Sequence, residues 1–280
     1  MPLSGKKVRM EKIKIGTRGS ALALAQAKLA AAALEEKGVQ AELVVVRTRG
    51  DEDLQNPLSL IGRGAFTDVF SDLLSRGEID VAVHSAKDLP VGEEKDSFYC
   101  LSRADARDVL VCAAPAEKIK KIGTGSPRRA AGALRLFPQA SVLPVRGNVD
   151  TRLRKLAAGE YDALVLAAAG LRRLGLLQGE QVLFENRAFF CRFFSPEECV
   201  PAACQGIIAL EGGASALVND APAQRAALLE RKALRLLGGD CTGGTGVYFD
   251  GTTLFAQREG KIAHLPYRGE ETLLALAEML

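Results

Sequence analysis

The sequence is poor in the residues that bind metals. It contains two histidines and six cysteines in 280 residues, and no two of those cysteines form a CxxC pair. Zinc and iron–sulfur sites need closely spaced cysteine or histidine ligands, so we expect no metal site. We expect most of the scattered thiols to be buried, reduced and inert, and both histidines to be structural.

Targeting and phosphate-binding signals are also missing. Lys6, Lys7 and Arg9 lie near the N-terminus, but no apolar segment follows them, which argues against a secretory signal. The most apolar run, residues 163–171, is far shorter than the ~20 residues of a transmembrane helix. We therefore expect a cytoplasmic protein that binds no membrane. No GxxxxGK[ST] loop occurs, which argues against a phosphate-handling transferase.

The global charge points to no macromolecular partner. A net charge of +3, with 48% apolar and 25% charged residues, is typical of an ordinary soluble protein, and we expect no nucleic-acid binding. The length predicts about two domains, with room for a small third one. Arginines gather locally, where they could face a polyanionic small molecule. These are Arg128, Arg129, Arg146, Arg152, Arg154, Arg172 and Arg173.

Three short phrases of the first third of the chain recur in the same order in the next third. KIGTRGS at 14–20 is echoed by KIGTGS at 121–126, TRGD at 48–51 by VRGN at 145–148, and GEID at 77–80 by GEYD at 159–162. The echo predicts two α/β units of similar plan, with basic and hydroxyl residues where apolar runs turn into helices. Such a layout favours an anion-binding cleft between two domains.

The pattern of apolar residues predicts the order of the elements. The first unit should have strands at 13–15, 41–46 and 80–83 and helices at 20–37 and 67–75. The second should have strands at 109–113, 121–122, 141–145 and 163–167, with helices starting at 126 and 148. A strand at 206–210, a helix at 223–237, hairpin strands within 247–263 and a helix at 271–279 should follow.

Two crossings between the units, at 103–107 and 196–201, are the expected hinges. The first domain should therefore comprise residues 1–105 and 200–220, the second 106–199 and the third 221–280. The fold class is α/β, with a small α+β domain at the C-terminal end.

The stretch VHSAKDLP at 83–90 places polar side chains at the end of a strand, where ligands bind in α/β sheets. In one interpretation it is a solvated loop in which Lys87 and Asp88 form a weak surface pair. In the other, Asp88 stabilises a developing cation and moves a proton, while Lys87 and Ser85 hold an anion. The residues alone leave both open.

A second group lies at a predicted helix start. Thr124, Ser126, Arg128 and Arg129 surround backbone N–H groups that attract anions. We expect Ala130, Ala133, Leu134 and Phe137 to form the buried stripe of that helix. The alternative is a capped helix with exposed arginines. We favour anion binding, because the same Gly-Thr…Ser arrangement recurs around Arg18 and Ser20, and because Arg146 and Arg152 repeat the theme.

Cys241 lies in the glycine-rich sequence GGDCTGG at 238–244. A lone cysteine in such a loop can be a nucleophile or an attachment point, although an incidental cysteine is equally compatible with the residues.

Four motifs together resemble one family over nearly the whole chain. They are GTRGS at 16–20 with LALAQ at 22–26, AVHSAKD at 82–88, RGNV at 146–149 with TRL at 151–153, and PA at 201–202 with QG at 205–206. This set resembles the porphobilinogen deaminases, also called hydroxymethylbilane synthases. The resemblance implies three domains, of which the first two are similar to type 2 periplasmic binding proteins, and a monomer.

The resemblance also implies an activity in tetrapyrrole and haem biosynthesis. A dipyrromethane cofactor, joined by a thioether to Cys241, would prime the head-to-tail condensation of four porphobilinogens with loss of ammonia. Hydrolysis would then free linear hydroxymethylbilane. Asp88 matches the catalytic aspartate, which would face pyrrole N–H groups and stabilise an azafulvenium-like cation.

The same resemblance assigns the binding residues. Those implied for the cofactor are Cys241, Ser85, Lys87, Asp88, Thr124, Ser126, Arg128, Arg129 and Arg146. Those implied for the substrate are Arg18, Ser20, Arg63, Arg152 and Arg173. Each pyrrole unit carries two carboxylates, so an oligopyrrole is a polyanion that several arginines could bind.

The chain departs from the family pattern at a few positions. Arg63 replaces a usual lysine, Cys204 a usual glycine, and Asp240 the glycine before the attachment cysteine. Ala21 and Pro127 are also unusual, and the third domain is short. A non-catalytic solute-binding or sensor protein that closes about a hinge is the competing interpretation. Such a protein needs neither Asp88 nor Cys241.

Overall fold

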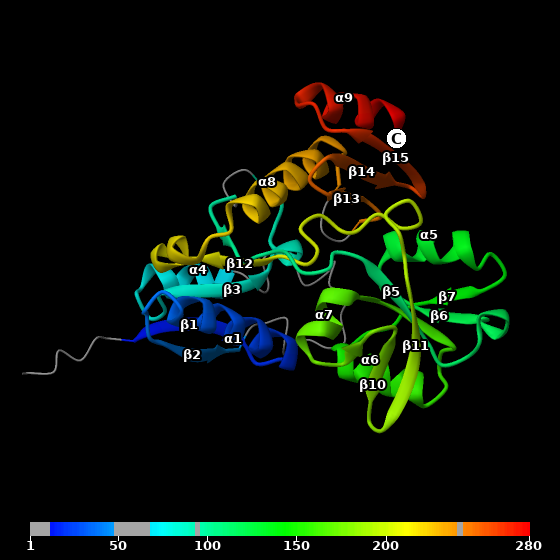
Figure 1. Ribbon diagram of the computed structural model, residues 1–280, viewed down its shortest axis with the longest axis horizontal. Coiled ribbons are helices and arrows are strands. Elements are labelled where there is room, and N and C mark those ends of the chain that lie inside the picture. The colour runs from blue at the N-terminus through cyan, green and yellow to red at the C-terminus, as the bar shows by residue number, and fades with distance from the viewer. Residues whose placement is uncertain (1–11, 48–67, 93–95, 240–242) are drawn as a thin grey trace, which may run out of the picture.

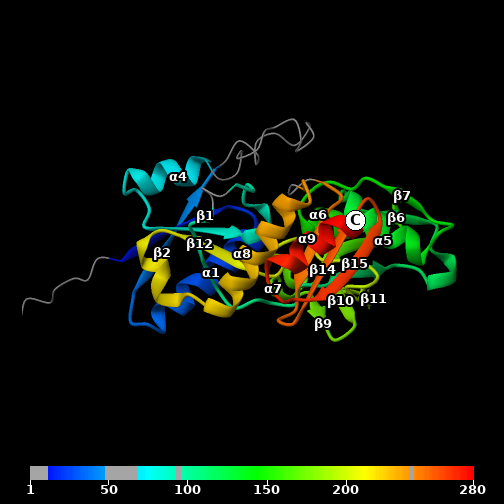
Figure 2. The same cartoon turned by 90° about the horizontal axis from the view of Figure 1, so that it is seen from above.

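Three β-sheets organise the chain, and each belongs to a different unit (Figure 1). The computed structural model describes residues 12–47, 68–92, 96–239 and 243–280. The first unit is blue and cyan in Figure 1, the second is green, and the third is orange and red. Figure 2 shows the first and second units side by side, with the third unit over their junction.

The first unit is a five-stranded sheet with helices packed against it. Its strand order is β2-β1-β3-β12-β4, in which β1 is parallel to both β2 and β3. Along the chain its elements are β1 (Ile13–Arg18), α1 (Ala21–Glu35), β2 (Ala41–Val46), α4 (Asp68–Ser75), β3 (Val81–Ser85), the 3-10 turn η1 (Ala86–Asp88) and β4 (Tyr99–Cys100).

The second unit is a seven-stranded sheet of order β7-β6-β8-β5-β11-β10-β9. Its elements are β5 (Asp108–Cys112), η3 (Ala116–Lys118), β6 (Lys121–Gly123), α5 (Pro127–Leu136), β7 (Ser141–Leu143), α6 (Val149–Ala157), β8 (Ala163–Ala167), α7 (Ala168–Arg173), β9 (Leu177–Gln178), β10 (Gln181–Phe184) and β11 (Arg187–Phe193). The strands β7, β6, β8 and β5 correspond to β2, β1, β3 and β12 of the first sheet. In both sheets the second strand of this order is parallel to its two neighbours, and the fourth is antiparallel to the third.

The repeated phrases of the sequence occupy equivalent places in the two sheets. Asp80 and Asp162 stand just before β3 and β8. Their carboxylates accept hydrogen bonds of 2.8 Å from the backbone N–H groups of Lys14 and Lys121 respectively. The N–H group of each aspartate donates back to the carbonyl of the same lysine. The phrase therefore recurs because the same hydrogen bonds align β1 with β3 in the first unit and β6 with β8 in the second.

The first glycine of KIGTRGS, Gly16, and that of KIGTGS, Gly123, each have a packing role. A Cβ on Gly16 would lie 2.5 Å from the Ile79 side chain, and a Cβ on Gly123 would lie 2.8 Å from the Tyr161 ring. Glycine is therefore required at both positions, because Ile79 packs over β1 at Gly16 and Tyr161 packs over β6 at Gly123. The second echo, between 48–51 and 145–148, falls partly outside the described residues.

Two antiparallel strands carry the chain from one unit to the other. After the first crossing, β5 pairs with β8, and Asp108 lies opposite Ala167. After the second crossing, β12 (Ile208–Glu211) returns to the first sheet, and Ile208 lies opposite Ser85. Both strands thus begin at the edge where the parallel strands end, so both crossings lie beside those strand ends.

The third unit packs a helix against a three-stranded antiparallel sheet. After η4 (Gly213–Val218), its elements are α8 (Ala221–Leu236), β13 (Gly246–Phe249), β14 (Thr253–Arg258), β15 (Lys261–Pro266) and α9 (Glu270–Met279). Its apolar side chains share one buried core with Ala86, Leu89 and Phe98 of the first unit. The helix α8 thereby fixes the third unit on the first.

Contacts with the second unit hold the other end of the third unit. Gln257, on β14, is completely buried. Its Oε1 accepts from the N–H of Val200 at 3.1 Å, and its Nε2 donates to the carbonyl of Arg128 at 3.1 Å. One side chain therefore joins the third unit to the second crossing and to the first turn of α5.

The observed architecture confirms the expected fold class: two α/β units of similar plan are followed by a small α+β unit. The domain boundaries proposed from the sequence stay a prediction.

The helix α5 differs from its prediction. Leu134, expected in the buried stripe, is 40% exposed, whereas Arg128 and Arg129 are almost fully buried. The cause is a close approach at Gly132, where a Cβ would lie 2.7 Å from the Cys199 side chain. The helix therefore turns its glycine face and first turn inward, and Leu134 outward.

Candidate functional site

The end of β3 places three of the predicted residues together. Ser85 is its last residue, and Ser85 Oγ lies 2.9 Å from Nε2 of Gln26, a buried residue on α1. The turn η1 then carries Lys87 and Asp88 beyond the strand. Lys87 is half-buried and Asp88 is exposed. The carboxylate can therefore meet a ligand, while the ammonium is largely withdrawn from water.

The equivalent edge of the second sheet holds the predicted anion-binding helix start. Ser126 caps α5, and its Oγ accepts from the N–H of Arg129 at 3.5 Å. Pro127 occupies the first helical position, where a missing N–H costs nothing. Thr124 is buried, and its Oγ1 accepts from the N–H of Ser126 at 3.2 Å. Sequence reasoning located this helix start correctly.

The two arginines in the first turn of α5, Arg128 and Arg129, converge on Asp108, the first residue of β5. Arg128 Nη1 donates to Asp108 Oδ2 at 2.7 Å, and Arg129 Nε donates to Asp108 Oδ1 at 2.9 Å. Asp108 is completely buried. Although burial opposes ionisation, the two guanidinium groups and their hydrogen bonds hold the pKa of Asp108 well below its usual range. The carboxylate is therefore ionised and fixes both arginines.

Gln205 links this cluster to the first unit. Its Nε2 donates to the Ala106 carbonyl at 2.7 Å and to Asp108 Oδ1 at 2.8 Å. These bonds turn Oε1 toward the cations, where it lies 3.3 Å from both Lys87 Nζ and Arg129 Nη2. The Gln205 amide thus bridges the strand-end residues of both α/β units.

The cluster carries more positive than negative charge. Lys87, Arg128 and Arg129 surround one buried carboxylate, that of Asp108, while the Asp88 carboxylate lies exposed beside them. Burial, followed by repulsion from Arg129, lowers the pKa of Lys87 from 10.5 to about 8. Burial, with a further contribution from Arg129, also lowers the pKa of Arg152. Positive charge is therefore crowded here, which favours the binding of an anion.

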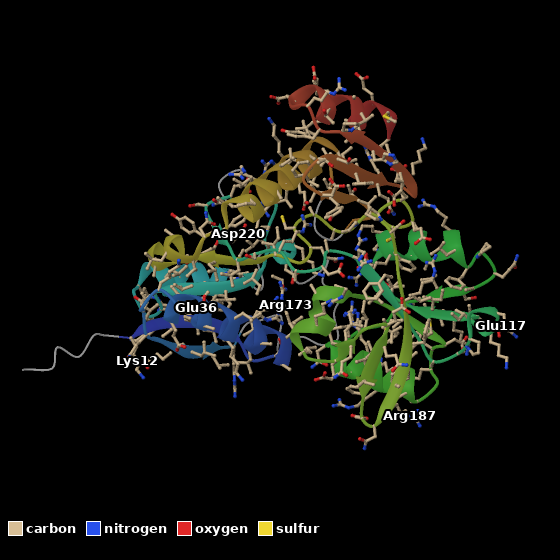
Figure 3. The ribbon with its side chains drawn as sticks, viewed as in Figure 1. Lys12, Glu36, Glu117, Arg173, Arg187 and Asp220 are labelled. Atoms are coloured by element: carbon tan, nitrogen blue, oxygen red, sulfur yellow. The ribbon has the colours of Figure 1, made fainter. Side chains whose placement is uncertain are left out.

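The remaining predicted residues lie around this centre. Arg173 Nη2, at the end of α7, donates to the Gly206 carbonyl at 2.6 Å, and burial lowers its pKa to about 10. Figure 3 shows Arg173 between the first and second units. Arg152 Nε donates to the Gly147 carbonyl at 2.8 Å. Arg18 ends β1 beside the end of β3, while Ser20 caps α1.

Of the three remaining predicted positions, one lies at the sheet edge and two lie outside the described residues. Arg146 is exposed and follows β7 at the same sheet edge as Thr124. Arg63 and Cys241 lie outside the described residues. The other five cysteines are free, and burial raises the pKa of each thiol, to about 11 for Cys112 and Cys199 and to about 12 for Cys100 and Cys191. The expectation of buried, unreactive thiols agrees with this environment.

Sequence reasoning gave no role to Asp108, Gln205 or Gln26. Gln205 belongs to a motif quoted above, and Gln26 to another, but neither pattern reveals a hydrogen-bond partner. Asp108 could have been predicted from the sequence, because it is the first residue of an apolar strand, and a buried carboxylate there needs a cation or a hydrogen-bond donor nearby.

Neither a metal site nor a membrane-spanning helix emerges from the described part of the chain. Its histidine, cysteine, aspartate and glutamate side chains form no group of three that could hold a metal ion. None of its helices is both long and apolar enough to cross a membrane.

Comparison with known proteins gives a consistent result. A family model described as "Porphobilinogen deaminase, dipyromethane cofactor binding domain" matches residues 13–217. A porphobilinogen deaminase of Cytophaga hutchinsonii is 40% identical over 249 residues, which cover 82% of this chain and 76% of the relative. A porphobilinogen deaminase of Acetivibrio thermocellus is 36% identical over 280 residues, which cover 92% of each chain.

A likeness to a solved structure is weaker. An ancestral cationic amino acid solute binding protein aligns with 80% of this chain and 91% of that chain, at 16% sequence identity and a TM-score of 0.42.

Proposed function

The chain belongs to the porphobilinogen deaminase family, and from this premise we propose that Asp88 is its catalytic group. The enzyme condenses four porphobilinogen molecules head to tail into hydroxymethylbilane, releases ammonia, and is primed by a covalent dipyrromethane. The observation that carries the assignment of the site is the excess of positive charge beside Asp88. A polycarboxylate ligand would neutralise it.

The residues present fit a dipyrromethane. Its acetate and propionate groups need several hydrogen-bond donors. Lys87, Arg129 and Arg152 place positive charges that are largely withdrawn from water close together. Thr124 and Ser126 add hydroxyl groups at a helix start. Arg128 is committed to Asp108 and to the Val200 carbonyl, so its role is to hold the helix start in place rather than to bind a carboxylate alone.

Cys241 is the proposed attachment point. The five other thiols lie in structured, mostly buried positions, and their raised pKa values disfavour the thiolate. When bound, the dipyrromethane supplies the free pyrrole α-carbon to which the first porphobilinogen is joined.

Asp88 acts on the substrate. Loss of ammonia breaks the bond between the aminomethyl carbon and nitrogen of porphobilinogen and leaves a cation conjugated with the pyrrole ring. The exposed Asp88 carboxylate stabilises this cation through the ring N–H. When the methylene carbon of the cation forms its new bond to a pyrrole α-carbon, that α-carbon loses its proton, and Asp88 would accept it. Lys87, held by Gln205, would bind a carboxylate of the dipyrromethane beside Asp88.

We also propose a monomer that works in the cytoplasm. The two α/β units supply both edges of the site within one chain, so the site needs no second copy. Five free thiols agree with a reducing compartment.

The test is Asp88→Asn, with Asp72→Asn as its control, because Asp72 is an exposed aspartate on α4, away from the strand ends. We expect Asp88→Asn to lower porphobilinogen turnover by about 10²- to 10⁴-fold and to leave the dipyrromethane attached, as measured by intact mass. Asp72→Asn should retain full activity. Unchanged turnover in Asp88→Asn would refute the catalytic role. A wild-type protein that binds porphobilinogen without consuming it would favour the solute-binding alternative.

A further inference from the structure

The buried arginine Arg231 lies against the turn that carries Asp88. It belongs to α8, the helix of the third unit that packs on the first unit (Figure 1), and it is 2% exposed. We propose that Arg231 is a positioning residue for the reaction, because it fixes the backbone that follows Asp88 and thereby sets where the carboxylate lies. This proposal rests on the function given above.

The catalytic turn, η1 (Ala86–Asp88), is too short to hold its own shape firmly. It has three residues, and the hydrogen bond that closes it, from the N–H of Leu89 to the carbonyl of Ala86, is 3.3 Å long. The N–H of Ala86 donates to the carbonyl of Ile207, which ties down the start of the turn. Because Asp88 is exposed, the backbone of this turn determines where its carboxylate lies. The end of the turn therefore needs support.

Arg231 supplies that support at the two residues that follow the catalytic turn. Its Nη2 donates to the carbonyl of Pro90 at 2.6 Å, and its Nη1 donates to the carbonyl of Leu89 at 3.5 Å. Its Nε donates to the carboxylate of Asp96. The three nitrogen atoms of one planar group thus bond three acceptors in different directions, and this fixes the positions of those acceptors relative to α8.

Two contacts keep the guanidinium in place although it is buried. The Asp96 carboxylate compensates its charge, and its central carbon lies 5.4 Å from the centre of the Phe98 ring. Apolar side chains of α8 and of the catalytic turn share one buried core around it. The turn therefore rests on α8 through apolar contacts and through Arg231, so its backbone cannot shift without breaking both.

The position of the Asp88 carboxylate matters for the rate of the reaction. Displacing a reacting group by about 1 Å can cost roughly 10²-fold in rate. The cations proposed for the substrate, Arg18, Arg152 and Arg173, lie on β1, α6 and α7 rather than on this turn. Loss of Arg231 should therefore slow the chemical step without weakening substrate binding.

The test is Arg231→Met, with Arg235→Met as its matched control. Arg235 lies one turn further along α8 and donates to the same Asp96 carboxylate at 2.8 Å, rather than to the catalytic turn. Methionine keeps much of the length and apolar contact of arginine but donates no hydrogen bond. Turnover of porphobilinogen is measured per molecule that carries the dipyrromethane mass, and urea unfolding measures the stability of each variant.

We expect Arg231→Met to lower kcat by roughly 10- to 100-fold and to leave KM within about 3-fold of the wild-type value. Arg235→Met should keep the wild-type kcat. A kcat of Arg231→Met equal to that of Arg235→Met would overturn the proposal, and so would a rise in KM as large as the fall in kcat. Failure of the wild-type protein to consume porphobilinogen would instead refute the proposed function itself.

A double variant separates positioning from stability. Arg231→Met is introduced into Asp88→Asn, and the rate of the first addition is followed by intact mass in quenched samples. The loss of stability should be the same in both backgrounds. The loss of rate should fall to less than about 2-fold, because the carboxylate on which Arg231 acts is already absent. Equal losses of rate in the two backgrounds would show that Arg231 does not act through Asp88.

Arg231→Lys answers the same question if Arg231→Met does not fold. A lysine keeps the charge beside Asp96, but its single ammonium cannot bond that carboxylate and both carbonyls in the geometry of a guanidinium. We expect Arg231→Lys to fold, to lower kcat and to leave KM unchanged. A wild-type kcat in Arg231→Lys would overturn the proposal.

Discussion

Lys87 makes the charge of the site sensitive to pH. Its folded-state pKa of about 8 lies below the usual 10.5 because the ammonium is withdrawn from water beside Arg129. Between these two values the unfolded chain binds more protons than the folded one. The contribution of Lys87 to the free energy of unfolding of the ligand-free protein therefore rises with pH across that window. A bound carboxylate reverses the effect, because it favours the charged ammonium.

We therefore predict that dipyrromethane loading weakens as pH rises through about 8. Lys87→Arg should retain loading at pH values above this, since a guanidinium stays protonated throughout. The measurement is the fraction of protein that carries the cofactor mass, followed over time from neutral to alkaline pH. Identical pH profiles for the wild type and Lys87→Arg would show that Lys87 does not bind a cofactor carboxylate.

Single residues also mark the limit of what the sequence could predict. The sequence correctly places Ser126 as a cap and Lys87 and Asp88 at a strand end, because both depend on local patterns. It misplaces the burial of Leu134 and does not reveal the burial of Arg128, because both depend on Cys199 and Asp108, which are distant in the chain. Residue type and spacing carry no information about such contacts.

At the scale of elements, the docking of β13 on the second crossing is unusually close. A Cβ on Gly246 would lie 2.6 Å from the Val200 carbonyl oxygen and 2.8 Å from the Arg128 side chain. Backbone atoms cannot move away as easily as the end of a side chain. The glycine is therefore required for contact between the third unit and the second crossing.

We predict that Gly246→Ala destabilises the protein by about 1–3 kcal/mol, whereas Gly213→Ala is nearly neutral because a Cβ there meets nothing within 4 Å. Urea unfolding of both variants measures this difference. Equal stability of Gly246→Ala and Gly213→Ala would mean that β13 can shift against the second crossing at little cost.

The predicted elements hold where the apolar pattern is continuous and fail in the segment that contains β9, β10 and β11. The helix predicted at 271–279 is observed as Glu270–Met279, and the strand at 163–167 as Ala163–Ala167. The antiparallel strands β9, β10 and β11 were missed. Burial alternates in β10, where Val182 and Phe184 are buried between exposed neighbours, so a period of two was present. This alternation was missed because β10 has only four residues and lies between polar turns.

For the whole molecule, the internal echo predicted the two-unit plan because the same hydrogen bonds recur at Asp80 and Asp162. The echo could not predict how the third unit is placed. That placement depends on buried polar contacts between segments far apart in the chain, such as those of Gln257.

Glu230 of α8 makes another such contact, and it joins three segments. Its completely buried carboxylate accepts from Arg103 Nη1 at 2.5 Å and Nη2 at 3.2 Å, next to the first crossing. It also accepts from the N–H of Cys204 at 2.6 Å, after the second crossing, and from the N–H of Phe249 at 2.8 Å, on β13. Both crossings and the third unit therefore meet at one carboxylate.

Glu230→Gln should consequently loosen the whole molecule rather than one unit. It leaves Arg103 with a buried, uncompensated charge, and breaking a buried pair in this way costs about 3–5 kcal/mol. The control is Lys232→Gln on the same helix, whose pair with Glu270 is exposed and should contribute less than about 1 kcal/mol. Urea unfolding gives the loss of stability, and hydrogen exchange shows where it falls. We expect faster exchange at 103–107 and 203–207 as well as in β13. Faster exchange confined to the third unit would instead mean that Glu230 stabilises its own unit only, and that the two crossings are held by the cluster around Gln205.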